Sequence, residues 1–236
     1  MAPPSRRGAA SNRLLGTLPA KDRRPLLALC EEVELGFGMV LDEPGSRIAH
    51  VYFPTDSYIS LITRPKGESS LEVGLVGDEG MHGISLALGI DVSPLDALVQ
   101  GGGPALRLSA GRFRRELAAR VSLQKALNRY LYVLMCQLAQ SAACTRFHLI
   151  EARLARWLLM TQDRAHADTF QVTHQFLAWM LGVRRVGVTA AASALQRRHL
   201  ITYARGVVTV LSRQGLEAAA CSCYKINKKI YDRMLP

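Results

Sequence analysis

Six arginines stand in a stretch of the chain that contains no carboxylate. The stretch runs from Thr169 to Leu216 and has no Asp or Glu. Its arginines are Arg184, Arg185, Arg197, Arg198, Arg205 and Arg213. A guanidinium group donates several N–H bonds in one plane, which suits phosphate oxygens and the acceptor edge of guanine. Because carboxylates would repel phosphate, their exclusion from a basic segment is typical of a surface that faces nucleic acid.

The net charge of the whole chain is concentrated in the same half. The chain has 236 residues, with 30 Lys and Arg against 19 Asp and Glu, which makes the net charge +11. Residues 147–236 have 13 basic and 5 acidic side chains, a net +8, whereas residues 1–146 have 17 and 14, a net +3. Such an excess favours a polyanionic partner, either nucleic acid or an acidic membrane surface. Hydrophobic residues make up 49% and charged residues 21%, which excludes a disordered chain.

The segment 173–196, THQFLAWMLGVRRVGVTAAASALQ, has the spacing of a helix-turn-helix. Thr173 can cap a helix, because its hydroxyl accepts a bond from a free N–H of the first turn. Ala178 is small where a second helix must cross closely, and Gly182 permits the left-handed backbone of a tight turn. Val188 belongs to the inner face of the second helix. An ordinary helical hairpin is the alternative, and the basic charge favours the DNA-binding motif.

A β-hairpin is predicted directly after the second helix. Residues 197–201 lead into a strand that ends at Ala204, Arg205 and Gly206 form the turn, and Val207–Leu211 returns. A helix-turn-helix followed by such a hairpin is a winged helix, with Arg205 at the tip of the wing. Residues 147–236 are therefore predicted to be a winged helix-turn-helix DNA-binding domain.

The first half of the chain has a different texture. Residues 1–12 are rich in Pro, Arg, Ala and Ser and are predicted to be a flexible arm. Residues 13–110 contain short runs of strand-forming residues, among them Val51–Phe53, Tyr58–Thr63 and Leu71–Val76, which turn residues separate. Repeated short strands of this kind predict an antiparallel barrel or a jelly-roll-like β-roll. The predicted fold class is α+β.

Residues 111–146 are predicted to form a long dimerisation helix and a hinge. The helix has an apolar seam made of Leu123, Leu127, Tyr130, Leu134 and Leu138. We expect this seam to pack on its own domain and on the twin helix of a homodimer. Cys144–His148 is expected to be the hinge between the two domains, and Ile150–Arg164 a further helix.

The cysteines and histidines form no recognisable metal motif in the sequence. The five cysteines are odd in number and scattered, which fits a reducing, cytoplasmic compartment. Cys221 and Cys223 could bind metal or form a redox pair, but no further Cys or His lies near them along the chain. Cys136 and Cys144 are expected to be small buried residues. No nucleophile elbow, P-loop or G-x-G-x-x-G motif is present, so no metal site, no catalytic residue and no enzyme is predicted.

The order of these parts resembles the Crp/Fnr superfamily of bacterial transcription regulators, which join a β-roll of the cyclic-nucleotide-binding type to a winged helix-turn-helix. The resemblance covers roughly residues 13–222 and rests chiefly on THQFLAWMLGVRR, QRRHLITYARG and IEARLARWLLM. It implies that Thr173, His174 and Gln175 start the helix that approaches phosphates. It also implies that Arg184 and Arg185 start the recognition helix, with Arg185 at the position that usually contacts guanine.

After that arginine the sequence departs from the family pattern. The family continues with Glu, Thr, Val and, after one residue, Arg, whereas this chain has Val186, Gly187, Val188, Thr189 and Ala190. The Glu that would accept from cytosine is missing, and so is the second Arg. Base contacts are therefore expected from Arg184, Arg185 and Thr189. Gly187 and Ala190 are expected to touch thymine methyl groups or nothing.

The sensor region lacks the contacts by which the family binds a cyclic nucleotide. The family uses a Gly-Glu pair and, a little further on, Arg-Ser or Arg-Thr. Here Gly83 is followed by Ile84, and Leu95-Asp96 occupies the second position. Since an Asp repels phosphate, cyclic AMP is not expected. The N-terminal cysteines of the oxygen-sensing branch are missing, so an iron–sulfur cluster is not expected either, and His82 is a weak candidate for contact with an unidentified effector.

The sequence thus predicts a homodimeric, sequence-specific transcription regulator in which a signal from the roll passes through the long helix to the recognition helices. Its expected partners are double-stranded DNA with a pseudo-palindromic operator and RNA polymerase, in the cytoplasm and away from membranes. The alternative is an effector-binding roll that regulates a protein partner rather than DNA. Four basic residues near the C-terminus could touch an acidic membrane, but a frayed helix end is the simpler interpretation. They are Lys225, Lys228, Lys229 and Arg233.

Overall fold

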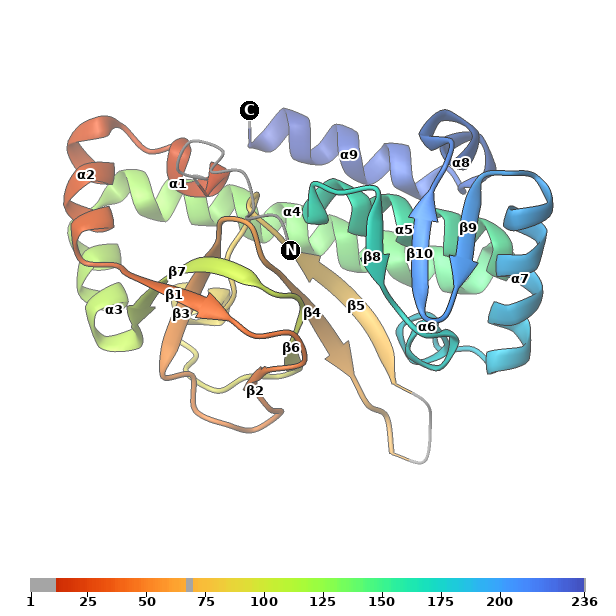
Figure 1. The fold of residues 1–236 in the computed structure, drawn as a ribbon. Coiled ribbons are helices and arrows are strands. Elements are labelled where there is room, and N and C mark those ends of the chain that lie inside the picture. Colours follow the sequence, from red (N-terminus) through yellow and green to blue (C-terminus); the bar gives the residue numbers. More distant parts are fainter. Residues whose placement is uncertain (1–11, 67–69, 236) are drawn as a thin grey trace.

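Between Glu31 and Ser109 the described residues form seven strands in two antiparallel sheets (Figure 1). The computed structural model describes residues 12–66 and 70–235. The strand order is β1-β7-β3 in one sheet and β2-β6-β4-β5 in the other. The strands are β1 (Glu31–Leu35), β2 (Val40–Asp42), β3 (His50–Pro54), β4 (Tyr58–Thr63), β5 (Leu71–Val76), β6 (Asp96–Gly101) and β7 (Gly103–Ser109). The predicted runs at 51–53, 58–63 and 71–76 all lie in these strands, so the β-roll is confirmed.

Short helices pack against the roll. They are α1 (Arg13–Gly16), α2 (Ala20–Ala28), the 3₁₀ helix η1 (Ile84–Leu88) and α3 (Ala110–Ala119). Asn12 begins this packed region, because its side chain caps α1 at the Leu15 N–H and donates to the carbonyls of Pro54 and Gly80 at 2.9 and 2.8 Å. The predicted arm of residues 1–12 is therefore wrong at Asn12, and its other residues lie outside the described part of the chain.

The long helical region is two helices rather than one. Helix α3 ends before Arg120, whose extended backbone precedes α4 (Val121–Phe147). Helix α4 continues through Cys144, which lies in the last turns of the helix and is 1% exposed. The predicted hinge of Cys144–His148 is therefore too early, since the backbone leaves the helical conformation at His148 and Leu149 and then enters α5 (Ile150–Ala165).

The apolar seam of α4 is filled by the core of its own chain. Four of the predicted dimer contacts are buried there, because the roll, α3 and the C-terminal helix cover this side of α4. They are Leu123, Leu127, Tyr130 and Leu134. The prediction that these four face a partner is corrected here, and Leu138, which is 46% exposed, is the member of the seam that reaches the surface.

The C-terminal domain is a winged helix-turn-helix, as the sequence predicted. After α5 come β8 (Thr169–Gln171), α6 (His174–Leu181), α7 (Arg185–Arg197), β9 (Ile201–Ala204), β10 (Val207–Val210) and α8 (Arg213–Ala219). The three strands form one sheet in the order β8-β10-β9. Strand β8 was not predicted, since three residues leave no readable periodicity. The hydrophobic core of the C-terminal domain also includes residues of the roll, among them Ile62 and Leu75, so the two domains share packed side chains.

The last helix, α9 (Cys223–Met234), turns back and lies along α4 (Figure 1). Tyr231 and Leu235 are buried in the same core as Tyr130 of α4. The prediction of a frayed basic C-terminal helix is therefore wrong, because one face of α9 is apolar and packed while its lysines are exposed on the other. None of the helices in the described residues is long and apolar enough to cross a membrane.

Candidate nucleic-acid interface

Local hydrogen bonds and one glycine determine where the first helix of the motif begins and ends. The Thr173 hydroxyl accepts a bond from the Phe176 N–H at 3.1 Å and so begins α6. Gly182 ends α6 with φ +60, in the left-handed region that favours glycine, and the Val183 N–H bonds back to the Ala178 carbonyl at 3.0 Å. The predicted cap and turn are therefore both confirmed.

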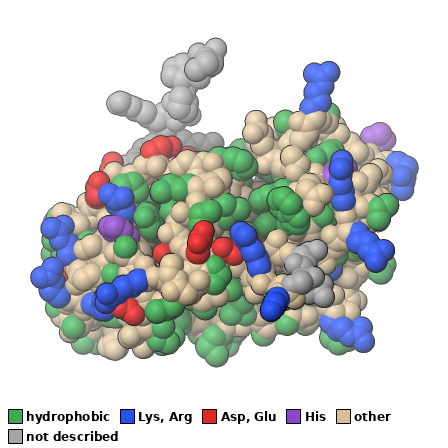
Figure 2. Space-filling view, turned by 90° about the horizontal axis from the view of Figure 1, so that it is seen from below, with side chains coloured by type: hydrophobic (Ala, Val, Ile, Leu, Met, Phe, Trp, Pro, Cys, Tyr) green, Lys and Arg blue, Asp and Glu red, His purple; other side chains and the backbone are tan. Residues whose placement is uncertain are grey.

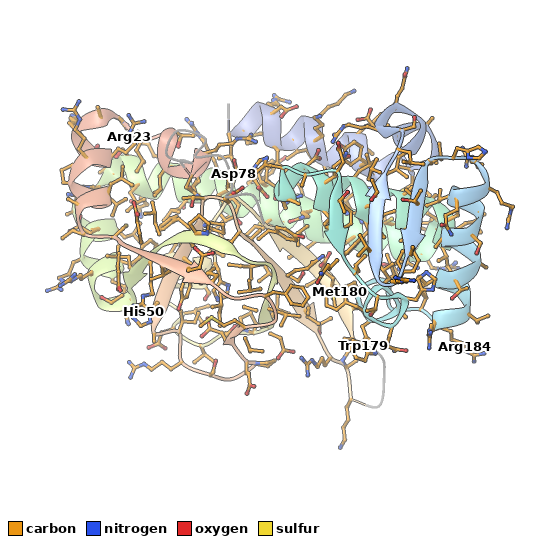
Figure 3. All side chains as sticks on the ribbon, viewed as in Figure 1. Arg23, His50, Asp78, Trp179, Met180 and Arg184 are labelled. Atoms are coloured by element: carbon orange, nitrogen blue, oxygen red, sulfur yellow. The ribbon has the colours of Figure 1, made fainter. Side chains whose placement is uncertain are left out.

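The recognition helix α7 starts with two exposed arginines. Arg184 is its N-cap residue and Arg185 its first helical residue, and its first turn contains no acidic side chain. Cations are unfavourable at a helix N-terminus, because the free N–H groups already carry partial positive charge there. Two arginines at this end therefore concentrate positive potential where an anion would bind. Figure 3 shows Arg184 at the outer end of the domain, away from the roll.

A stacked pair supports the start of α6. The ring of His174 stacks on Tyr203 of β9, with centroids 4.2 Å apart and planes at 14°. Its Nδ1 lies 3.1 Å from the hydroxyl of Thr189, which also donates to the Arg185 carbonyl at 3.1 Å. Burial lowers the pKa of His174, and the charge of Arg185 lowers it further. The expected contact of Thr189 with a base thus competes with its hydrogen bonds to His174 and to the Arg185 carbonyl. Gln175, the third residue expected at the start of α6, is exposed.

Gly187 and Ala190 of α7, which were expected to touch thymine methyl groups or nothing, have different surroundings. A Cβ at Gly187 would meet the Cδ1 of Ile150 at 2.8 Å, so this glycine permits close packing of α7 on α5. Ala190 is exposed, as its expected role requires. Val186 was not singled out in the sequence, yet it is 73% exposed beside Arg185. An exposed Val at this place can contact a thymine methyl group.

The wing ends in a tight two-residue turn. Arg205 and Gly206 have φ values of +50 and +77, which are those of the hairpin turn whose twist matches the flanking strands. The side chain of Arg205 is exposed at the tip. The predicted position of Arg205 is therefore confirmed, and the left-handed backbone at a non-glycine residue marks a sharply defined tip.

Charge on this end of the molecule is positive and mostly unpaired. Arg198 binds Glu151 at 2.9 Å and Arg213 binds Asp163 at 2.6 Å. The other four arginines of the acid-free stretch have no carboxylate partner among the described residues; they are Arg184, Arg185, Arg197 and Arg205. On the face shown in Figure 2, blue side chains line the helix-turn-helix end, whereas the roll and the middle have both red and blue ones.

The sensor residues that the sequence singled out are engaged within the roll. His82 is 5% exposed, and its Nε2 lies 2.6 Å from the Asp42 carboxylate. Asp96 is buried and lies 2.9 Å from the Arg64 guanidinium. Both side chains therefore have partners in the chain, which argues against His82 as a free effector contact and leaves the effector site unassigned.

Glu72 of β5 connects the roll to the winged helix-turn-helix domain. Its carboxylate accepts from Ser60 of β4 at 2.7 Å and from the indole N–H of Trp157 of α5 at 3.1 Å. Burial of this carboxylate raises the pKa of Glu72 to about 7, although the hydrogen bond from Ser60 and the charge of Arg164 oppose the change. A group that gains or loses a proton near neutral pH thus lies between the domains.

Replacing Glu72 with Gln is expected to change how stability depends on pH. Because the pKa of Glu72 is higher in the folded chain than in the unfolded one, this group favours folding below about pH 4.5 and loses that contribution as the pH rises through about 7. The free energy of unfolding of Glu72→Gln, relative to that of the unchanged chain, should therefore rise between pH 5 and pH 8, by at most about 3 kcal/mol. Denaturant titrations at both pH values measure the gap, with the exposed Glu32→Gln as control. A gap that is the same at both pH values would contradict the prediction.

Folding also brings together four side chains that the sequence left apart. Cys144 of α4, His148 in the hinge, Cys221 before α9 and Cys223 at its first position place their ligand atoms within 4.8 Å of one another. A hydrogen bond with Cys221 lowers the pKa of the Cys144 thiol to about 5, against the effect of burial and with help from the charge of Arg156. The prediction that Cys144 is a small buried residue is confirmed, but the sequence did not indicate that it would meet His148 and two other cysteines. The signal was the pair Cys144-x-x-x-His148, which is one helical turn long.

Comparison with known proteins agrees with this architecture. Residues 152–219 match the family model of the Crp-like helix-turn-helix domain. A putative Crp/Fnr regulator from Eubacterium rectale shares 13% identity at a TM-score of 0.68, over 90% of this chain and 97% of that one. FixK2 from Bradyrhizobium japonicum shares 12% at 0.68, over 81% and 98%. The c-di-GMP-responsive global regulator CLP from Xanthomonas campestris shares 17% at 0.66, over 82% and 100%. A search of curated proteins found no match.

The fold and the site define a class of protein in which a β-roll is joined by a long helix to a winged helix-turn-helix. Residues 152–219 match the Crp-like helix-turn-helix domain, and the chain as a whole has the fold of solved Crp/Fnr transcription regulators.

Proposed function

We propose that the chain is a homodimeric transcription regulator that binds a pseudo-palindromic operator in double-stranded DNA. The observation that carries the proposal is the pair Arg184 and Arg185, exposed at the positive N-terminus of α7 with no carboxylate partner among the described residues. In a helix-turn-helix dimer, two such helices enter successive major grooves about 34 Å apart. Arg185 is the proposed guanine contact, and Arg205 and the start of α6 are the proposed phosphate contacts.

Selection of bound DNA from a random library tests this function. The expected result is enrichment of two inverted half-sites whose centres are one helical turn apart, since that spacing follows from the geometry of a twofold dimer. The same library at rising salt should lose weakly bound random sequences first, because phosphate contacts depend most on salt. Selection that enriches no sequence, combined with a tight protein partner at the same surface, would favour regulation of a protein instead.

The proposed dimer contact is the exposed side of α4. Tyr132, Met135 and Leu138 are 50%, 66% and 46% exposed, and their spacing of three places them along one stripe near the middle of the helix. Apolar stripes of this kind pair with a second helix in water, because the contact removes them from solvent. This stripe replaces the buried part of the seam that the sequence suggested.

Met135→Glu is expected to convert the dimer to a monomer at micromolar concentration. A charge buried in an apolar helix contact loses its hydration and gains no partner, which costs several kcal/mol. Light scattering coupled to size exclusion measures the mass. The matched control is Phe37→Glu, which puts a charge at a residue of similar exposure (64%) on the roll and should leave the mass unchanged. A chain that is monomeric without any substitution would contradict the proposed dimer.

The proposed signal passes between the domains of one chain. Glu72 with Trp157 and Glu79 with Arg164 both join the roll to α5. A pocket of about 370 Å³ also lies where the roll meets α6, and the side chains of Ile62, Phe176 and Trp179 line it. An effector bound in that pocket would touch both domains, so its binding would change the position of the helix-turn-helix.

A further inference from the structure

The two halves of the cysteine and histidine group come from distant parts of the chain. Cys144 lies in the last turns of α4, and His148 is the residue that ends it, with its N–H bonded to the Cys144 carbonyl at 3.2 Å. Cys221 is 77 positions after Cys144, and its N–H donates to the Ala152 carbonyl at 3.4 Å. Cys223 is the first residue of α9. The site therefore forms only when α9 is folded against the hinge.

The spacing within the group is that of ligands around one ion. The sulfurs of Cys144 and Cys221 are 3.5 Å apart, and the sulfur of Cys223 is 3.4 Å from Nδ1 of His148. Tetrahedral zinc, with bonds of about 2.3 Å to sulfur and about 2.0–2.1 Å to nitrogen, places neighbouring ligand atoms about 3.5–3.8 Å apart. A cluster of several irons would spread its ligands over more than one metal. The compact group of four therefore fits a single ion.

Burial and neighbouring groups suit three thiolates. Cys144, Cys221 and Cys223 are 1%, 8% and 0% exposed. The amide N–H of Gln140 donates to the Cys223 sulfur at 3.0 Å, a bond that orients a ligand and stabilises its charge. Arg156 donates to Ser141 at 3.3 Å, one helical turn before Cys144. Three thiolates with Zn²⁺ carry one net negative charge, which this guanidinium can balance.

We propose that Cys144, His148, Cys221 and Cys223 form a structural zinc site that fastens the interdomain hinge to the start of α9. Three sulfurs and one imidazole are a ligand set that favours zinc, and four protein ligands leave no open position for a substrate. All four residues lie outside the segment 152–219 that matches the Crp-like domain. The proposed site therefore lies where the chain enters that segment and where it leaves it.

Metal at this place would fix the geometry of the hinge. It would tie the end of α4 to the first turn of α9, and α9 in turn packs Tyr231 and Leu235 into the core around α4. Binding free energy at such a site contributes to folding, because the unfolded chain has no preformed ligand set. Loss of the ion should therefore loosen the hinge and the beginning of α9 while the strands of the roll stay folded.

Two measurements on the full-length chain, purified in reductant, test the site without reference to DNA. Elemental analysis should find about one zinc per chain. Titration of the metal-free chain with Co²⁺ should produce strong thiolate-to-cobalt charge-transfer absorption and the intense visible bands of tetrahedral cobalt, displaced by equimolar Zn²⁺. Hydrogen exchange should accelerate at residues 144–152 and 221–226 after zinc is removed, with little change in β4 and β6.

Substitutions locate the ion. Cys223→Ser and Cys144→Ser should each release zinc to a chelator at least tenfold faster than the unchanged chain, and should weaken the cobalt charge-transfer band. The matched control is Cys136→Ser, which removes a half-buried cysteine of the same helix, two turns before Cys144. It should keep both zinc and spectrum. Because the cobalt spectrum of the unchanged chain is informative by itself, misfolding of a variant does not decide the test.

Three results would overturn the proposal. The first is a chain that holds far less than one zinc and shows no thiolate-to-cobalt band. The second is zinc that Cys136→Ser releases as readily as Cys223→Ser, since the ion would then lie elsewhere. The third is an iron chromophore in place of zinc. Failure of DNA selection would leave the zinc proposal intact, and loss of zinc binding would leave the DNA-binding surface intact.

Discussion

Arg185→Ala is expected to remove most of the preference for an operator over random DNA. A bidentate arginine–guanine contact discriminates against other bases by about 1–3 kcal/mol, and a dimer makes that contact twice. Specific affinity should therefore fall by about 2–6 kcal/mol in total, whereas affinity for random DNA should change little. The reason lies in the position of Arg185, which is exposed as the first residue of α7, where base edges are within reach.

Fluorescence anisotropy with the selected operator and with a scrambled duplex, at the same salt concentration, measures both affinities. The matched control is Arg197→Ala, which removes another exposed arginine from the last turn of the same helix. Arg197→Ala should lower the affinity for both duplexes to a similar, small extent, because it removes charge without removing a base contact. If Arg185→Ala still prefers the operator as strongly as the unchanged chain, the assignment of Arg185 is wrong.

Arg164→Met is expected to lower the free energy of unfolding by about 3–5 kcal/mol, because it leaves the carboxylate of Glu79 buried without its cation. Arg164 of α5 approaches Glu79 of the roll at 2.6 Å through Nη2 and 2.8 Å through Nε. Their side chains are 8% and 6% exposed. Burial by itself would lower the pKa of Arg164, but the charge of Glu79 outweighs it and raises that pKa.

The geometry around the pair explains why the effect should be large. Arg164 also donates to the Met160 carbonyl at 2.9 Å and lies over the ring of Tyr231 at 5.8 Å, so one side chain joins α5, the roll and α9. The pair borders a pocket of about 200 Å³ between the domains, which Asp78 and Tyr224 also line. Figure 3 shows Asp78 between the roll and the C-terminal helices. Loss of Arg164 should therefore loosen the docking of the DNA-binding domain as well as the fold.

Denaturant titration of the purified chain measures the loss. Adding Glu79→Leu to Arg164→Met should recover much of it, because no buried charge then lacks a partner. The control is Arg47→Met, which breaks the exposed pair with Asp91 at 3.0 Å and should cost less than about 1 kcal/mol. Equal losses for Arg164→Met and Arg47→Met would show that the buried pair does not hold the domains together.

Features that depend on neighbouring residues could be predicted from the sequence. The hydroxyl of Thr173 reaches an N–H three residues away, and Gly182 adopts the left-handed backbone within its own turn. The turn at Arg205 and Gly206 is equally local. These energies come from the backbone and are decided within a few positions, so the helix-turn-helix, the wing and the place of Arg185 were determined by the sequence alone.

Features that depend on distant segments were decided only by the tertiary structure. The sequence shows an apolar stripe on α4 but not which side the roll and α9 cover, so Tyr130 became a core residue and Met135 stayed exposed. Gly187 was a candidate beside DNA until α7 packed on Ile150. The group of Cys144 and Cys221 spans 77 positions, and only the packing of α9 against the hinge brings it together. Periodicity fixes which residues share a face of one element, whereas long-range packing chooses the partner of that face.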